Sequence, residues 1–295
     1  MSASFTYRWA AFAFLAALTL PAYGQEVEGP EAFDAIPADA ASPFGGLSIN
    51  PTRVVLEGAD RASSVTLYNS GDQPVTYRIE PVNMTPSEEG GYSQPEEGAP
   101  PPRWSAEPLL RYAPRQVTLG PGQRQRVRIL SRARRDTPAG EYRTHMRFAS
   151  IPLVEEVGED EEVVATPEVE GGNNSLSVSI GLEYRVSIPV ILRVGDLEGS
   201  ISVASAALET TEAGRREAVL ELKRVGERSE YAQIRLFDSG GQEVGLLRGV
   251  SVYPPLDRRV VRVPVAQGAN VPVRAVLESL EGDTGEPRLI AEMAL

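Results

Sequence analysis

The chain has 295 residues, with 41 acidic and 29 basic side chains, a formal net charge of -12, one histidine (His145) and no cysteine. The lack of cysteine excludes thiolate catalysis, disulfides and Cys-rich zinc modules, and a single histidine leaves few ligands for any other zinc site. The acidic balance argues against nucleic acid as a partner, because its phosphates would repel this surface. No residue pattern predicts a metal, a cofactor or a small-molecule substrate.

The first 24 residues predict a cleavable export signal. Arg8 supplies a positive start, residues 9–20 form an apolar run, and Ala22-Tyr23-Gly24 places small residues at positions −3 and −1 of a cleavage site. An uncleaved membrane anchor is the alternative, but the run is shorter than the ~20 residues that span a bilayer. We therefore expect cleavage after Gly24, followed by a flexible arm over residues 25–46 that is rich in Ala, Pro, Gly and acids.

From Leu47 onward, short runs of β-branched and apolar residues alternate with turn-forming residues. This pattern predicts an all-β protein. Two long interruptions are predicted to be loops: the proline-rich segment 84–103 and the acidic segment 154–174. A domain boundary is expected near Gly195, which gives two β-sandwiches in tandem, over residues 47–195 and 196–295.

The segment 175–192 predicts an unusually long strand. Apolar residues alternate there with small or polar ones, and the alternating apolar row is Leu176, Val178, Ile180, Leu182, Tyr184, Val186 and Ile188. An ordinary sandwich strand would bury the part of this row from about Tyr184 onward in its own core. A typical strand of ~5 to 6 residues is too short to cover the rest, so Leu176–Leu182 is a candidate for contact with another chain.

Several segments resemble the first domain of the PapD-like periplasmic pilus chaperones of the chaperone-usher pathway. The similarity covers most of residues 47–193 in the family's order and spacing, whereas the second domain matches only in size and β character. The segments that carry the resemblance are Leu47–Val55, Ser64–Pro74, Tyr112–Gln123, Val127–Ile129 and Pro138–Pro152. The acidic segment lies where family members differ in loop length, which places the chain with the long-loop members.

The resemblance implies two immunoglobulin-like β-sandwich domains in a boomerang arrangement and a periplasmic, non-enzymatic role. In that family, the long last strand of the first domain pairs with an incomplete pilus subunit, which is then delivered to an outer-membrane usher. The matching subunit-binding positions here are Leu176, Val178, Ile180, Leu182 and Tyr184.

The family also anchors the subunit's C-terminal carboxylate with an arginine of the first strand and a lysine near the end of the donor strand. Arg53 matches the arginine. Pro189 stands where the lysine is expected, and the only lysine of the chain, Lys223, lies in the second domain. Since a guanidinium can bind a carboxylate through two hydrogen bonds, Arg53 could act with Arg193 or Arg185 as the helper. Alternation puts Arg185 on the face opposite the apolar row.

The remaining features are assigned structural roles. Arg124, Arg126 and Arg128 alternate with other residues and are predicted to form the polar face of a strand, although Arg128 is also a candidate for an ion pair between the domains. His145 has no second histidine or cysteine nearby in the sequence, so a packed or surface histidine is favoured over a catalytic one.

Two other classes of protein remain possible. A secreted Ig-like structural or adhesion component of a surface fibre would have the same β character, but its first domain should lack a complete final strand. A carbohydrate-cleaving enzyme would need paired carboxylates in a cleft, and the acidic residues are concentrated in loops without a recognisable pair. The prediction is therefore a chaperone, and not an enzyme.

Overall fold

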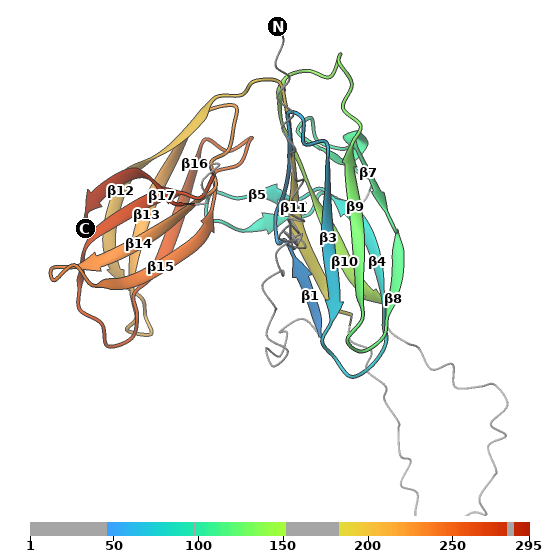
Figure 1. The fold of residues 1–295 in the computed structure, drawn as a ribbon. Coiled ribbons are helices and arrows are strands. Elements are labelled where there is room, and N and C mark those ends of the chain that lie inside the picture. The colour runs from blue at the N-terminus through green and yellow to red at the C-terminus, as the bar shows by residue number, and fades with distance from the viewer. Residues whose placement is uncertain (1–45, 97, 152–182, 282–285) are drawn as a thin grey trace, which may run out of the picture. The chain divides into compact units, whose positions relative to one another are not determined.

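The computed structural model describes residues 46–96, 98–151, 183–281 and 286–295, all within one compact unit (Figure 1). The predicted export signal, nearly all of the predicted arm, and the positions Leu176, Val178, Ile180 and Leu182 lie outside the described residues. The described part consists almost entirely of strands, which confirms the predicted all-β class. None of its helices is long and apolar enough to cross a membrane.

The first sandwich is built from two facing sheets. One sheet has the order β1-β3-β9-β7 and the other has the order β2-β11-β10-β4-β8. The strands are β1 (Leu47–Asn50), β2 (Val54–Glu57), β3 (Ala62–Asn69), β4 (Val75–Val82), β7 (Leu110–Ala113), β8 (Gln116–Leu119), β9 (Arg124–Ser131), β10 (Gly140–Ile151) and β11 (Arg185–Val194). β1 is an edge strand of the first sheet and β2 is an edge strand of the second, so the chain crosses from one sheet to the other between Asn50 and Val54.

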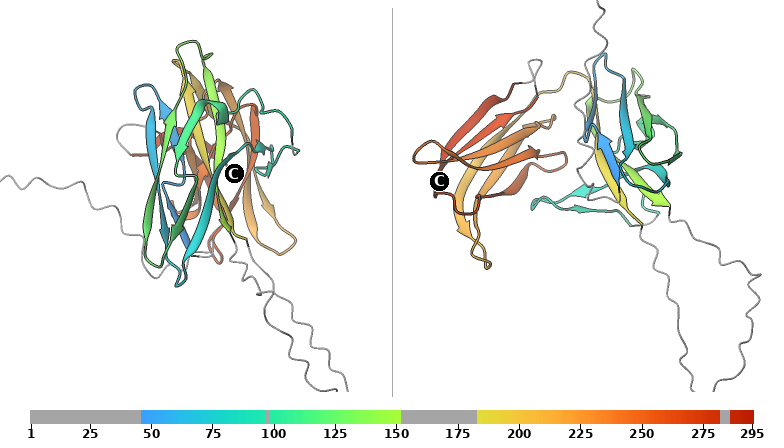
Figure 2. Two further views of the ribbon diagram at one scale, coloured as in Figure 1. Left: turned by 90° about the vertical axis from the view of Figure 1, so that its right-hand side faces the viewer. Right: turned by 60° about the horizontal axis from the view of Figure 1, so that its bottom comes forward.

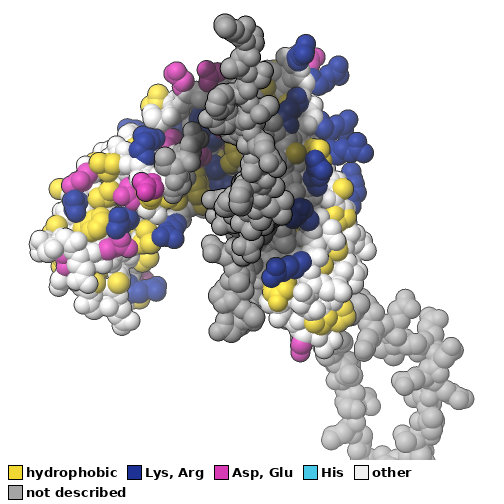
Figure 3. Space-filling model, viewed as in Figure 1, with side chains coloured by type: hydrophobic (Ala, Val, Ile, Leu, Met, Phe, Trp, Pro, Cys, Tyr) yellow, Lys and Arg dark blue, Asp and Glu magenta, His cyan; other side chains and the backbone are white. Residues whose placement is uncertain are grey.

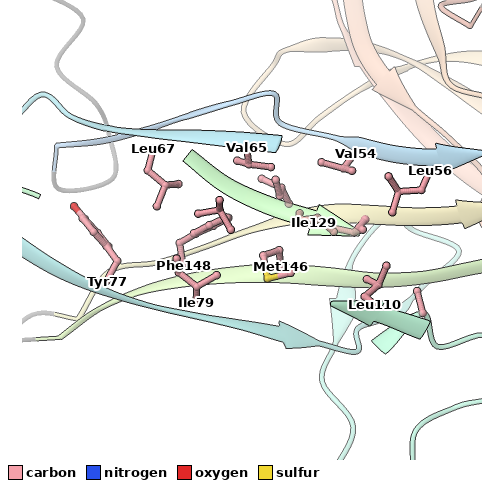
Figure 4. Close-up of a cluster of buried hydrophobic side chains, with 14 of the residues drawn as sticks. Val54, Leu56, Val65, Leu67, Tyr77, Ile79, Leu110, Ile129, Met146 and Phe148 are labelled. Atoms are coloured by element: carbon pink, nitrogen blue, oxygen red, sulfur yellow. The ribbon is translucent and has the colours of Figure 1, made fainter. Parts of the chain in front are cut away.

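Alternation along β9 explains how this sandwich forms. Val127 and Ile129 are fully buried, and Val127 lies opposite Val65 of β3. Together with Leu67, Met146 and Phe148 they belong to one continuous apolar core between the sheets (Figure 4). Arg124, Arg126 and Arg128 are exposed on the other face, which confirms the predicted polar face. Figure 3 shows basic side chains gathered over this side of the first sandwich.

Asn69, at the end of β3, stabilises the turn between β3 and β4 through side-chain hydrogen bonds. Its buried side-chain amide donates to the carbonyl oxygens of Gln73 at 2.8 Å and Leu119 at 2.9 Å, and its Oδ1 accepts from the N–H of Gly71 at 2.9 Å. Because Asn69→Ala leaves these groups without partners, we expect a loss of about 2–3 kcal/mol in the free energy of unfolding, measured with urea. A loss of less than about 0.5 kcal/mol in Asn69→Ala would contradict this role of the side chain.

The second sandwich has its own sheets and its own core. Its sheets have the orders β12-β13-β16 and β15-β14-β17-β18. The strands are β12 (Gly199–Thr210), β13 (Arg216–Gly226), β14 (Ala232–Asp238), β15 (Glu243–Val250), β16 (Arg258–Pro264), β17 (Pro272–Ser279) and β18 (Arg288–Ala294). Its buried apolar residues, such as Leu220, Ile234 and Val263, form a cluster separate from that of the first sandwich. The described fold is therefore two β-sandwiches in tandem, as predicted.

The proline-rich segment predicted as a surface loop contains a short hairpin, β5 (Thr85–Pro86) and β6 (Tyr92–Ser93). Figures 1 and 2 show that it projects away from the sheets of the first sandwich. At its tip, the carbonyl oxygen of Glu88 accepts from the N–H of Val260 at 2.7 Å, and the Glu88 carboxylate pairs with Arg258 at 2.6 Å. The hairpin β5–β6 thus contacts β16, an edge strand of the second sandwich.

Candidate functional site

The strand β11 is paired along both edges for only part of its length. It pairs with β10 from Arg185 to Val194, whereas β2 covers only Val190–Arg193 on its other edge. Among the described residues, no strand pairs with that edge between Arg185 and Pro189. At ~3.3 Å per residue, this leaves about 16 Å of strand edge that could pair with another strand.

The apolar row of β11 is buried over only part of its length. Ile188, Val190 and Leu192 lie in the core of the first sandwich. The side chain of Tyr184, on the same face but just before the strand, is 41% exposed. The part of the apolar row that enters the core therefore begins at Ile188, later than the position near Tyr184 expected from the sequence.

Tyr184 is fixed to the first sandwich through its backbone. Its N–H donates to Oγ of Ser150 and its carbonyl oxygen accepts from the N–H of Ser150, both at 2.8 Å. Arg185, which follows, forms an exposed ion pair with Glu183. The predicted subunit-binding residue Tyr184 thus presents an exposed ring at the point where the chain joins the sheet.

Arg193, the predicted helper of the carboxylate anchor, is buried within a cluster of carboxylates. Its Nε donates to Glu141 at 3.0 Å, its Nη1 to Glu57 at 3.0 Å, and its Nη2 to Glu281 at 3.0 Å and to the carbonyl oxygen of Ser229 at 2.6 Å. Only 2% of its side chain is exposed. All the nitrogens of this guanidinium are therefore hydrogen-bonded to groups of the chain itself, and they join the first sandwich to Ser229 and Glu281 of the second.

The charges of this cluster stabilise one another. Burial alone would lower the pKa of Arg193, but its hydrogen bonds to Glu281 and Glu141 raise that pKa above the ordinary value. Burial likewise opposes ionisation of Glu281, yet Arg193, Arg53 and Arg228 lower the pKa of this carboxyl. Sequence reasoning named Arg128 for an ion pair between the domains. Arg128 is exposed on the outer face of β9 and forms no ion pair within the described residues, whereas Arg193 pairs with Glu281 of the second sandwich.

Arg53, the predicted carboxylate anchor, lies just before β2 beside an open pocket. Its Nη2 donates to Glu281 at 3.1 Å, and its guanidinium stacks over the ring of Tyr231 at 4.5 Å. Its Nε is buried and has no hydrogen-bond partner among the described residues. Within the described residues, Arg53 therefore has an N–H group without an acceptor, whereas every guanidinium nitrogen of Arg193 donates a hydrogen bond.

The pocket beside Arg53 has a volume of about 330 Å³. Its lining comes from both sandwiches, and we call it the arginine pocket: Thr52, Arg53, Met84, Tyr92, His145, Ser187, Pro189, Tyr231, Gly249, Tyr253 and Arg259. Pro189, which stands at the position where the resemblance expects a lysine, is part of the wall. The sequence pointed to Arg53 but gave no signal for Arg259, which reaches the pocket from β16.

His145 is packed at the edge of this pocket, in agreement with the structural role predicted for it. Its side chain is nearly buried and meets the ring of Tyr92 edge-on, with ring centroids 5.1 Å apart. Burial, together with the charge of Arg143, lowers the pKa of His145 to about 4. The imidazole is therefore neutral in the folded protein at neutral pH.

The depressed pKa of His145 predicts acid sensitivity. Between pH 6.5 and 4 the unfolded chain binds a proton on this side chain that the folded chain does not, so stability is full above about pH 6.5 and falls as the pH drops toward 4. Urea unfolding of the wild type and of His145→Phe at pH 7 and 4.5 should show a wild-type loss larger by about 2–3 kcal/mol. Equal losses would mean that His145 is protonated in the folded state.

No family model and no curated protein matches the chain. Among solved structures it is similar to several chaperones, including the YadV chaperone, with 13% identity, a TM-score of 0.45 and coverage of 85% of this chain and 100% of that chain. The E. coli chaperone DraB has 15% identity, a TM-score of 0.42 and coverage of 84% and 96%. The Pseudomonas aeruginosa CupB2 chaperone has 14% identity, a TM-score of 0.43 and coverage of 84% and 100%. These identities are too low to transfer the roles of individual residues.

Proposed function

We propose that the chain is a periplasmic chaperone that binds incomplete Ig-like subunits of a pilus or surface fibre and delivers them to an outer-membrane usher. The observation that carries the proposal is the edge of β11 between Arg185 and Pro189, with which no strand of the described residues pairs and which follows the alternating row of residues 176–184 in the sequence. A strand with a free edge and a row of apolar side chains can complete a sheet in another protein.

The proposed binding mode uses two kinds of contact. The backbone of residues 175–189 pairs with the subunit and fixes the register, while Leu176, Val178, Ile180, Leu182 and Tyr184 enter the subunit's open groove. Burying a large apolar side chain contributes roughly 1.5–3 kcal/mol, so four or five of them give a gross term on the order of 10 kcal/mol before ordering costs. Arg53, which lines the arginine pocket and whose Nε has no hydrogen-bond partner among the described residues, holds the carboxylate at the subunit's C-terminus.

The alternative, a structural or adhesion component of a surface fibre, is less well supported. Such a component needs a strand from a neighbour to complete its sandwich. In this chain the sheet β2-β11-β10-β4-β8 already has β11, whose residues Ile188, Val190 and Leu192 fill the core. The first sandwich therefore has its own last strand.

Ile180→Asp together with Leu182→Asp tests the donated strand. The wild type, purified from periplasm, should bring with it a small β-rich subunit in a one-to-one complex that mass spectrometry identifies. The double variant should fold but lose this subunit, because two charges would have to be buried in an apolar groove. Ser177→Asp with Ser179→Asp places the same charges on the opposite face and should retain capture. Unchanged capture by the Ile180 and Leu182 variant would overturn the proposal.

A further inference from the structure

The arginine pocket and its immediate surroundings carry more positive charge than the described residues neutralise. Arg53, Arg143 and Arg259 lie in or next to it. Of these, only Arg53 forms an ion pair within the described residues, and its partner Glu281 is shared with Arg193 and Arg228. In all three arginines Nε is buried, and it has no hydrogen-bond partner in the described part of the chain. This local excess of cations stands out in a chain whose net charge is -12.

The three arginines differ in whether an aromatic ring lies against the positive charge of the guanidinium. The guanidinium of Arg143 lies 4.5 Å from the ring centroid of Tyr253 and 5.2 Å from that of Trp104, and that of Arg53 lies 4.5 Å from Tyr231. No such ring contact involves Arg259 in the described structure. Its Nη1 donates to the carbonyl oxygen of Ser251 at 2.8 Å, which fixes its position without neutralising its charge. Arg259 is therefore the least compensated of the three.

Uncompensated charge of this kind favours an anionic ligand. A partly buried guanidinium with an unused N–H loses hydration without regaining an equivalent hydrogen bond, and a carboxylate would restore both the bond and the charge balance. The pocket has room for such a group and is open at the surface. The tyrosines around it, Tyr92, Tyr231 and Tyr253, offer rings that can pack against an attached side chain.

We propose that Arg53 and Arg259 together bind one carboxylate in the arginine pocket, so that the anion is held by one cation from each sandwich. The identity of this carboxylate as the C-terminus of a client subunit rests on the function proposed above. Arg259 then supplies the second positive charge that position 189, a proline, cannot supply. Because Arg259 belongs to β16 and Arg53 lies beside β2, the bound carboxylate connects the two sandwiches.

N-acetyltyrosine is a suitable probe, and N-acetyltyrosine amide, which lacks the negative charge, is its control. In titrations of the full chain followed by NMR, the Nε–H signals of Arg53 and Arg259 should shift with the acid and stay in place with the amide. Arg53→Gln and Arg259→Gln should each weaken binding of the acid at least tenfold. Arg262→Gln is the matched control, because Arg262 is an exposed arginine of the same strand that pairs with Glu209, and it should bind within twofold of the wild type.

Equal shifts with the acid and the amide would overturn the anion site, and full affinity in Arg259→Gln would overturn the role of Arg259. The wild-type titration decides the first point even if a variant fails to fold. A chain that binds the acid through both arginines but captures no subunit from periplasm would support the anion site and overturn the proposed chaperone function. The two proposals can therefore fail separately.

Discussion

Arg53→Ala is expected to abolish capture of the client subunit. The substitution removes the guanidinium whose free Nε faces no partner among the described residues, and with it one cation of the arginine pocket. A charge-assisted pair of hydrogen bonds to a carboxylate contributes about 1.5–3 kcal/mol per bond, so capture should fall by more than tenfold. Co-purification of the subunit, quantified against the amount of this chain, measures the effect.

Arg228→Ala is the control for this experiment. Arg228 also pairs with Glu281, at 3.0 Å, and with Glu57, at 2.9 Å, but it does not line the arginine pocket. Arg228→Ala therefore removes an ion pair between the sandwiches, as Arg53→Ala does, but leaves the proposed carboxylate anchor in place. Equal loss of capture in the two variants would assign the effect to the joint between the sandwiches, and full capture by Arg53→Ala would place the carboxylate elsewhere.

Arg193→Ala should cause the largest loss of stability among single charge substitutions in the described part of the chain. The side chain of Glu141 is only 1% exposed, and removing Arg193 leaves this carboxylate with Ser229 as its remaining partner. Breaking a buried pair by removing one member typically costs about 3–5 kcal/mol. Urea unfolding at pH 7 should show a loss of this size. Arg185→Ala, which breaks only an exposed pair on the same strand, should change stability by less than about 1 kcal/mol.

The double variant Arg193→Ala, Glu141→Gln separates buried charge from lost packing. If the uncompensated Glu141 carboxylate causes most of the loss, adding Glu141→Gln should recover about 1–2 kcal/mol of it. If the double variant is less stable than Arg193→Ala by the full cost of Glu141→Gln alone, the two residues act independently and the explanation by buried charge is wrong.

The sandwich fold could be predicted because its signal is local. In β9, the alternation of Arg126, Val127, Arg128 and Ile129 specifies which face is buried before any partner strand is known, and the structure has this pattern. The extent of β11 was less predictable. Its apolar row runs without a break from Leu176 to Ile188, and nothing in that row shows that the buried core begins only at Ile188.

The joint between the sandwiches could not be predicted, since its residues are far apart in the sequence. Glu57, Glu141, Arg193 and Glu281 come from four separate segments, and each alone resembles any other charged residue of a β-rich chain. Arg259 is a similar case, because the hairpin β5–β6 and the strand β16 must both be in place before it reaches the arginine pocket. The resemblance identified Arg53 because its place within the segment Leu47–Val55 follows from sequence order alone.

The carboxylate cluster around Arg193 also sets an order for assembly. Glu57, Glu141 and Arg193 are synthesised long before Glu281, so the first sandwich can form most of this cluster by itself. The last acceptor arrives only when the final strands of the second sandwich have emerged. Arg53, which also pairs with Glu281, reaches its final surroundings at the same moment. A chain that ends before residue 281 would thus lack the carboxylate that pairs with both Arg53 and Arg193, and the ion pairs between the two sandwiches would be incomplete.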